Sequence, residues 1–301
     1  MGVKRFNKIV CVDHTKLEEW AIKELQEYSE AEVEVYRESP DSENELIDRI
    51  GDAEAIIVSW RTQIPKNVIE KCSHLKYIGM ACSLYDDESA NVAVDFAREK
   101  GITVKGIFDY GDPGVIEFII SELIRLLHGF GEYQWQKMPV ELTSKKIGII
   151  GLGTTGQLLA RALLPLGADV YYFSRTRKKD WEAKGLQYLS LNNLLKTSEI
   201  ISLHLPKNTK LLEVEEFETF GLGKILINTS LGLPFEEKAF VNWINAEGNF
   251  GIFDGDGSAS LSDATKEKNR VISYKKSAGW SAETQQRLSK KVLENLKSYF
   301  N

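Results

Sequence analysis

Cysteine, histidine and long apolar runs are all scarce in this chain of 301 residues, which contains three cysteines and four histidines. Cys11, Cys72 and Cys82 are an odd number without metal-ligand spacing, and the histidines are scattered, so we expect reduced thiols and no metal. No apolar run approaches 18 residues and the N-terminus lacks a signal-peptide pattern. These absences argue against a membrane protein, and we expect a cytoplasmic one.

Excess positive charge is also missing. The formal net charge is −6, which argues against a nucleic-acid partner, and the basic cluster Arg175–Lys179 is too short to provide such a surface. Hydrophobic residues make up 43% of the sequence, enough to bury one or two ordinary cores. The length favours two domains.

The most informative segment present is Lys146–Gly156, an apolar run that leads into a glycine turn and then into helical spacing. Gly151 would permit the tight turn, Gly153 would let a pyrophosphate approach the backbone, and Gly156 would let the helix pack on the strand. With Thr154 and Thr155 between them, these glycines predict a dinucleotide site. The alternative is a plain buried turn between strand and helix.

The end of the next strand indicates which dinucleotide. An NAD site normally has an Asp or Glu about 20 residues after the glycines, to hold the ribose 2′-hydroxyl. Here the strand Asp169–Phe173 is followed by Ser174, Arg175, Thr176 and Arg177, and then by two lysines. Arginine forks onto phosphate oxygens, so NADP(H) is favoured over NAD(H). A solvated basic loop is the alternative, but it leaves the missing acid unexplained.

The rest of the chain alternates short apolar runs with amphipathic stretches, as in α/β proteins with parallel sheets. In the first part, Thr15 and Glu18 predict a capping box for a helix through Glu27. Together the elements predict a flavodoxin-like layout without a phosphate loop. Strands are expected at Lys8–Val12, Val33–Tyr36, Ala55–Val58 and Leu75–Met80, and helices at Glu43–Ile50 and Lys66–Lys71.

A second unit is expected to begin near Ile107 and to be a doubly wound nucleotide domain. The last helix, from a Ser281 cap to Tyr299, should return to the first unit. We therefore assign 1–106 with 281–301 to one domain and 107–280 to the other, with a ligand cleft between them. Beyond Phe173, strands are expected at Leu186–Tyr188, Ile200–His204, Ile225–Asn228, Phe250–Asp254 and Val271–Ser273.

Several short motifs occur in a specific order and spacing along nearly the whole chain. They are Leu75–Gly79, Gly101–Val104, Val115–Glu117, the glycine turn, Ser202–Pro206 and Ile227–Ser230. In this order the chain resembles the D-isomer-specific 2-hydroxyacid dehydrogenases, and Phe173–Arg177 is similar to the NADPH-using glyoxylate and hydroxypyruvate reductases.

The resemblance implies a flavodoxin-like substrate domain interrupted by a Rossmann cofactor domain, a small-molecule substrate and a homodimer. Beyond the glycine turn and the basic loop, it implies cofactor contacts at His204, Pro206, Thr229 and Asp254.

The same resemblance predicts a changed reaction centre. The family uses an arginine, a glutamate and a histidine, and the matching positions here hold Leu231, Ala259 and Lys276. The family's Gly-x-Gly substrate turn corresponds to Cys82-Ser83-Leu84, followed by an acidic insertion at Asp86–Ser89. A simple keto acid is therefore not the expected substrate.

Other side chains could carry the chemistry instead. Lys276 is the leading candidate, because a buried ammonium can attract a developing alkoxide and give it a proton. Tyr110 and Tyr274 could supply a hydroxyl. The alternatives are a solvated surface lysine and tyrosines that only pack, and Cys82 is expected to be an inert buried thiol.

Two hypotheses about function stay open. The first is an NADP(H)-dependent oxidoreductase with a rebuilt centre, and it predicts a deep, desolvated Lys276. The second is an inactive NADP(H)-binding sensor or assembly protein, in which Leu231 and Ala259 reflect lost catalysis.

Overall fold

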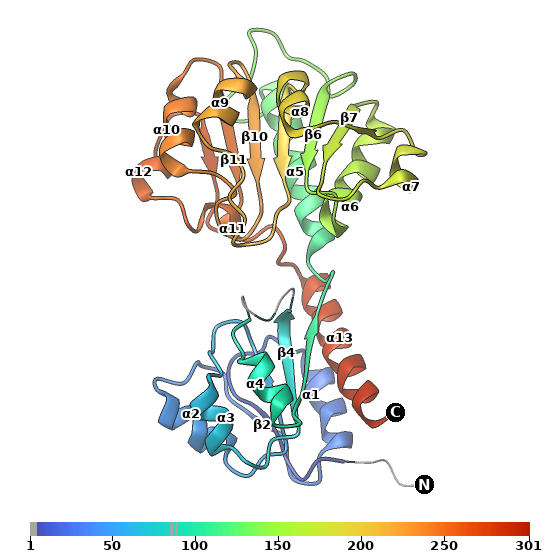
Figure 1. Ribbon diagram of the computed structural model, residues 1–301, viewed down its shortest axis with the longest axis vertical. Coiled ribbons are helices and arrows are strands. Elements are labelled where there is room, and N and C mark those ends of the chain that lie inside the picture. The colour runs from blue at the N-terminus through green and yellow to red at the C-terminus, as the bar shows by residue number, and fades with distance from the viewer. Residues whose placement is uncertain (1–4, 85–86, 88–89) are drawn as a thin grey trace. The chain divides into compact units, whose positions relative to one another are not determined.

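A computed structural model describes residues 5–84, 87 and 90–301 of the chain (Figure 1). It has two compact units, one of residues up to Tyr110 together with Ser281–Asn301, and the other of Gly111–Trp280. The division after Tyr110 lies just beyond the last strand of the first sheet, which ends at Ile107.

The first unit is built on a parallel sheet, which has five strands in the described residues and the order β2-β1-β3-β4-β5. This is the flavodoxin-like order expected from the sequence. The strands are β1 (Ile9–Cys11), β2 (Glu34–Val35), β3 (Ala55–Val58), β4 (Tyr77–Ser83) and β5 (Thr103–Ile107).

Successive strand residues of this sheet enter two different cores, since side chains alternate between the faces of a strand. Val10 and Ile56 pack with Leu46 and Val68 on one face, whereas Ile57 packs with Leu25 and Leu293 on the other. Both faces are thus covered by helices. They are α1 (Glu19–Leu25), η1 (Gln26–Tyr28), α2 (Glu43–Ile50), α3 (Lys66–Lys71), α4 (Val94–Glu99) and α13 (Ala282–Phe300).

The expected capping box at Thr15 is wrong. Helix α1 begins at Glu19 after an N-cap at Glu18, and no side chain caps it. Lys16 has φ +62°, which interrupts any helical path from Thr15, and Thr15 is buried in the loop. In contrast, the Ser281 cap of α13 is confirmed, because its hydroxyl accepts from the Thr284 N–H at 3.1 Å.

The second unit contains a parallel sheet with the order β12-β11-β10-β9-β6-β7-β8, again for the residues described. The segment β8-β7-β6-β9-β10-β11 reproduces the doubly wound order 3-2-1-4-5-6. The strands are β6 (Lys146–Ile150), β7 (Asp169–Phe173), β8 (Gln187–Tyr188), β9 (Ile200–Leu203), β10 (Ile225–Asn228), β11 (Phe250–Phe253) and β12 (Val271–Ser273).

Helices cover both faces of this sheet as well. Ile147 and Ile149 pack with Leu123 and Leu159 on one face, and Ile150 packs with Phe217 on the other. The strand order and the two layers put the carboxyl ends of β6, β9, β10, β11 and β12 along one edge. The helices are α5 (Asp112–His128), α6 (Thr154–Leu163), η2 (Leu164–Leu166), α7 (Lys179–Glu182), α8 (Leu191–Thr197), α9 (Val214–Phe220), α10 (Glu237–Asn245), α11 (Gly255–Ser258) and α12 (Asp263–Lys266).

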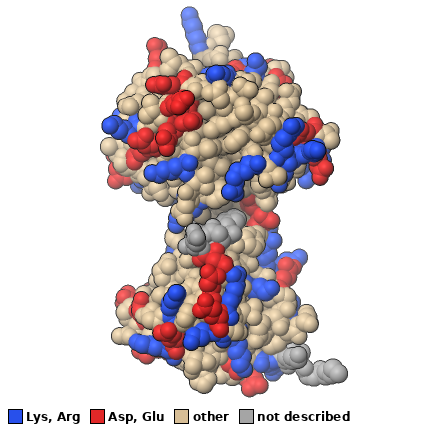
Figure 2. All heavy atoms as spheres, viewed as in Figure 1, with Lys and Arg blue, Asp and Glu red and all other residues tan. Residues whose placement is uncertain are grey.

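Figure 2 shows basic and acidic side chains interspersed over the viewed face of each unit. Among the helices of the described residues, none is long and apolar enough to cross a membrane.

Candidate functional site

The glycine turn between β6 and α6 is shaped by contacts that only glycine allows. Gly151 has φ +96°, and a Cβ there would lie 2.1 Å from the carbonyl oxygen of His204. A Cβ on Gly156 would lie 2.2 Å from the carbonyl oxygen of Gly151. Both positions therefore bring backbone against backbone, as the sequence predicted for the turn and for the packing of helix on strand.

Gly153 has a different environment. A Cβ built there meets nothing within 4 Å, so the backbone faces open space at the start of α6. The first N–H groups of a helix have no partner within the helix, and they carry the positive end of its dipole. Open space, free amides and a positive potential together fit the diphosphate of a dinucleotide.

The two threonines of the turn differ in their surroundings. Thr154 is exposed, whereas Thr155 is half-buried and its hydroxyl donates to the carboxylate of Asp112, the first residue of α5. This places a negative charge close to the phosphate-binding turn. The sequence gave no signal for it, because 43 residues separate the two side chains.

The basic loop after β7 contains two arginines with different contacts. The Arg177 guanidinium pairs with Glu182, with Nε 3.0 Å from Oε1, and lies 4.9 Å from the ring centroid of Tyr188. Arg175 is exposed and forms no ion pair with any other described residue. Ser174 donates to the carbonyl oxygen of Thr176 at 2.5 Å, which tightens the loop. Arg175 is thus the arginine left available to an incoming anion.

His204 lies at the end of β9, beside the glycine turn. Its backbone N–H donates to the Ile150 carbonyl at 2.8 Å, and its ring Nε2 is 2.9 Å from the Ser202 hydroxyl. Burial lowers the pKa of the imidazole to about 4, so the ring is neutral at pH 7. Pro206, two residues further on, is exposed.

The loop after β10 is fixed by a side chain that the sequence analysis did not single out. The Asn228 amide donates to the carbonyls of Gly232 and Gly257, both at 3.2 Å, and accepts from the Ser230 N–H. Ser230 in turn donates to the Leu203 carbonyl at 3.0 Å. Thr229, half-buried between them, is held in place by its neighbours. The available signal was the polar Asn228 at the end of an otherwise apolar strand, with Ser230 two residues further on.

Asp254 fixes the loop after β11 by hydrogen bonds, as Asn228 fixes the loop after β10. It is fully buried and accepts two backbone bonds of 2.8 Å, from Gly257 and from Ala278. Burial raises the pKa of its carboxyl group. One carboxylate oxygen accepts from the Gly257 N–H and the other from the Ala278 N–H, so the side chain of Asp254 links α11 to the segment after β12. The described residues contain no cluster of three His, Cys, Asp or Glu able to hold a metal.

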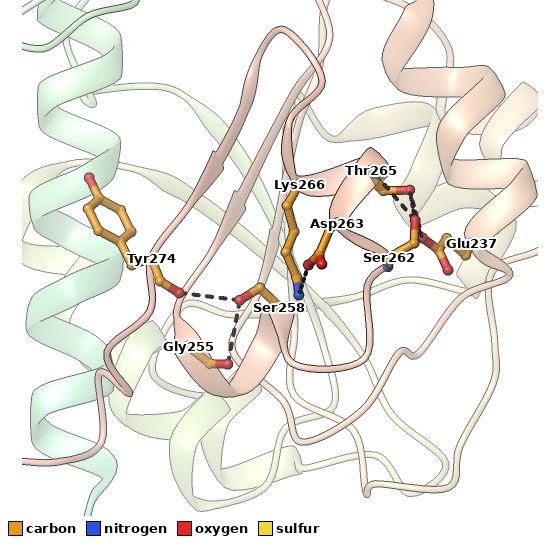
Figure 3. Close-up of polar contacts among 8 residues, drawn as sticks. All are labelled: Glu237, Gly255, Ser258, Ser262, Asp263, Thr265, Lys266 and Tyr274. Atoms are coloured by element: carbon orange, nitrogen blue, oxygen red, sulfur yellow. Dashed lines mark hydrogen bonds and ion pairs between the residues drawn. The ribbon is translucent and has the colours of Figure 1, made fainter.

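Figure 3 shows how α11 and α12 are anchored after β11. The Ser258 hydroxyl donates to the Tyr274 carbonyl at 3.3 Å, joining α11 to the end of β12. Glu237 accepts from the hydroxyls of Ser262 and Thr265, at 2.7 and 2.6 Å, and holds the start of α12. The strand ends are therefore linked through backbone groups and small polar side chains.

The three positions matched to the family's reaction centre lie after β10, β11 and β12, on the same edge of the sheet. Leu231 has 53% of its surface exposed, and Ala259 and Lys276 are exposed too. The expectation of a deep, desolvated Lys276 is therefore wrong. The backbone explains the position, because the Lys276 carbonyl accepts from the Gly255 N–H at 2.8 Å while the side chain points to solvent.

The other candidates are placed as follows. Tyr110 belongs to the first unit, where it is half-buried and its carbonyl accepts from Arg287 at 2.7 Å. Tyr274 donates its hydroxyl to Glu122 on α5 at 2.7 Å, so that hydroxyl is already engaged. Cys82 is buried, and burial raises its thiol pKa to about 12, as expected of an inert thiol.

The segment Cys82-Ser83-Leu84, expected to correspond to the family's substrate turn, does not begin as a turn, because β4 continues through Ser83. Of the acidic insertion, Asp86, Glu88 and Ser89 lie outside the described residues, and Asp87 pairs with Arg98.

The chain can be compared with known proteins. A model of the "D-isomer specific 2-hydroxyacid dehydrogenase, NAD binding domain" matches residues 122–253. A hydroxypyruvate reductase of Blautia hydrogenotrophica is 30% identical over 221 residues, 67% of either chain. A glyoxylate reductase of Korarchaeum cryptofilum is 26% identical over 86% of this chain and 83% of its own.

A solved structure titled acyclic imino acid reductase, in complex with NADPH and D-Arg, superposes with a TM-score of 0.79 at 26% identity. The match covers 97% of this chain and 96% of that one. Together with the doubly wound order and the glycine turn, these matches show that the second unit is an NAD(P)-binding domain. The chain belongs to the D-isomer-specific 2-hydroxyacid dehydrogenase family.

Proposed function

We propose that the protein is an NADP(H)-dependent oxidoreductase whose reaction centre differs from that of its family. The observation that carries this proposal is the end of β7, which offers the exposed Arg175 where an NAD enzyme has a carboxylate. An arginine there suits a ribose phosphate. The solved relative that carries NADPH is consistent with this choice.

The substrate follows from what the edge of the second sheet offers. Leu231 supplies no charge for a carboxylate, and neither Ala259 nor Lys276 provides an imidazole held by a carboxylate. The bound cofactor would supply a hydride. The exposed ammonium of Lys276 would then stabilise the developing negative charge on a carbonyl oxygen and donate a proton to it. We therefore propose a carbonyl compound other than a simple 2-keto acid.

Imine reduction is a second candidate. An iminium ion already carries its proton on nitrogen, so its reduction needs no strong acid from the protein. This fits a chain in which Lys276, and not a histidine, lies at the position matched to the family's proton donor, and the solved relative titled an imino acid reductase supports it. In this case Lys276 would not be needed as an acid.

We also propose that the protein forms a homodimer through its second unit. Phe130 and Met138, in the segment that follows α5, each expose 71% of their surface. Large apolar side chains that are this exposed are typical of interaction surfaces. Analytical ultracentrifugation of the protein and of a Phe130→Ser, Met138→Ser variant tests this, and a monomeric wild type would contradict it.

The cofactor proposal is tested by calorimetric titration of the protein with NADPH and with NADH. We expect NADPH to bind at least about tenfold more tightly, the worth of one charge-assisted contact. Equal affinities would overturn the NADP(H) assignment. Absence of binding by either nucleotide would overturn the function.

A substrate screen then separates the hypotheses. NADPH consumption is followed with a panel of aldehydes, ketones and keto acids, each with and without an amine that forms the imine. If the wild type reduces a carbonyl compound without an amine and Lys276→Ala does not, the first proposal is supported. Amine-dependent turnover that survives in this variant supports imine reduction. Binding without turnover of any compound would favour the inactive sensor.

A further inference from the structure

A buried tyrosine near the end of β7 contacts the loop that follows the strand. Tyr172 is fully buried, and its ring packs edge-on against the ring of Tyr188 on β8, with the centroids 5.5 Å apart. In the parallel sheet it stands opposite Ile149 of β6 on one side and opposite Tyr188 on the other. A side chain packed in this way has little freedom, so its hydroxyl is held at a fixed point.

That hydroxyl forms two hydrogen bonds, one with the loop and one with the helix after it. It donates to Oε1 of Glu182 on α7 at 2.7 Å and accepts from the backbone N–H of Lys178 at 2.8 Å. A hydroxyl has a single proton, so donation to Glu182 leaves the oxygen to accept from Lys178. The bond from Arg177, followed by the bond from Tyr172, lowers the pKa of the Glu182 carboxyl group. The acceptor is therefore charged at pH 7.

The loop is also held at its other end. The Gly151 N–H, in the phosphate-binding turn, donates to the Phe173 carbonyl at 2.8 Å. Residues 174–178 thus run between two fixed points, the glycine turn and the Tyr172 hydroxyl, in the connection from β7 to α7 (Figure 1). Arg175 lies between these points. The two bonds therefore limit where Arg175 can lie relative to the turn that receives the diphosphate.

Arg175 gains most from this arrangement. Its side chain is exposed, and a long flexible side chain loses conformational entropy when it binds a phosphate. The total loss on binding is smaller when the backbone that carries the side chain is already ordered, which is the general benefit of preorganisation. NADH has a hydroxyl where NADPH has the ribose phosphate, so its binding depends much less on the order of this loop.

We propose that the Tyr172 hydroxyl is a positioning group for cofactor choice, which holds the loop after β7 in the shape in which Arg175 meets a ribose phosphate. The inference rests on the proposed function in one respect, since it takes NADP(H) to be the ligand of this loop. Tyr172 is buried and acts through Arg175, without touching the cofactor. It lies outside Phe173–Arg177, the segment whose sequence favours NADP(H).

The test is calorimetric titration of the full-length protein with NADPH and with NADH. Tyr172→Phe is the test variant, because it removes only the hydroxyl and keeps the ring in the core. Lys178 is exposed, so its freed N–H can bind water and the variant should fold. Tyr171→Phe is the matched control, since Tyr171 precedes Tyr172 on the same strand and packs on the opposite face of the sheet.

We expect Tyr172→Phe to bind NADPH about three- to tenfold more weakly than the wild type, as the loss of one hydrogen bond implies, and to bind NADH equally well. Tyr171→Phe should bind both nucleotides as the wild type does. A general loosening of the domain would instead weaken the binding of both nucleotides alike.

A double variant tests whether the hydroxyl acts through the arginine. Added to Arg175→Gln, Tyr172→Phe should cause no further loss of NADPH affinity. Additive losses, an equal loss for NADH, or unchanged NADPH affinity in Tyr172→Phe would overturn the inference. A wild type without preference for NADPH would overturn the proposed function together with this inference. A wild type that prefers NADPH and a Tyr172→Phe variant with the same preference would overturn this inference alone.

Discussion

At the scale of single residues, two arginines only two positions apart, Arg175 and Arg177, have different surroundings. Arg175 and Arg177 read alike in the sequence, yet Glu182 and the ring of Tyr188 hold Arg177 while Arg175 faces solvent. The sequence could indicate a phosphate-binding loop. It could not rank the arginines, because the partner of one lies in the next helix.

The two arginines should therefore respond differently to mutation. Arg175→Gln is expected to weaken NADPH binding about 10- to 100-fold, the loss of one or two charge-assisted bonds, and to leave NADH binding unchanged. Arg177→Gln should affect NADPH binding less, because its guanidinium already has a partner. Calorimetric titration of both variants with both nucleotides checks this, and equal losses would contradict the assignment.

His204 should make stability depend on pH. Its pKa falls from 6.5 to about 4 on folding, so between these values the unfolded chain binds a proton that the folded one does not. Unfolding free energy should then decrease as pH falls from 6.5 towards 4, by about 1–3 kcal/mol after allowance for partial exposure.

Urea unfolding of wild type and His204→Gln at several pH values isolates this effect, because the other titrating groups are common to both. The free energy of unfolding of the wild type minus that of His204→Gln should be largest at pH 7.5 and smallest near pH 4.5. A constant difference would show that His204 does not titrate as described.

At the scale of elements, some strands and helices with regular apolar spacing were predictable to the residue, and others, such as β1, β2 and β9, to within one residue at an end. The bounds of α2, α3, β3, β10 and β12 agree with expectation. The errors fall where backbone conformation overrides pattern, as at Lys16 with its positive φ, or where a strand continues into residues read as a turn, as at Cys82 and Ser83. Such features depend on neighbours that are distant in sequence.

The start of α5 should regulate the strength of cofactor binding. Asp112 places a carboxylate against Thr155 in the phosphate-binding turn. We expect Asp112→Asn to bind NADPH about three- to tenfold more tightly at low salt, because a like charge is removed, and the gain should shrink as salt screens it. The cost to α5 of about 0.3–1 kcal/mol should appear only in thermal unfolding.

Asp169→Asn is the matched control, since Asp169 is exposed at the amino end of β7. Affinity that is unchanged in Asp112→Asn would show that the carboxylate lies too far from the diphosphate to matter.

At the scale of the whole molecule, the family and both folds followed from the order of short motifs and from strand order. The chemistry did not follow, because it depends on the surroundings of individual side chains. Leu231, Ala259 and Lys276 are the basis of our proposal of an altered centre, but their exposure could not be anticipated from the sequence.

This leads to a prediction about substrates. Glyoxylate, hydroxypyruvate and pyruvate should be poor substrates of the wild type with NADPH. The triple variant Leu231→Arg, Ala259→Glu, Lys276→His should gain at least about 10²-fold in kcat/KM for one of them, the usual worth of a positioned acid. The single variant Leu231→Arg serves as the control. Robust turnover by the wild type would refute the idea of a rebuilt centre.

The bonds made by Asn228, Ser230, Asp254 and Ser258 hold the strand-end loops without using the side chains of Leu231, Ala259 or Lys276. The amino acids that fix these loops are consequently separate from the three solvent-facing positions matched to the family's reaction centre. Those three positions can be exchanged while the loops keep their form, so a designer could change them to install a new chemistry.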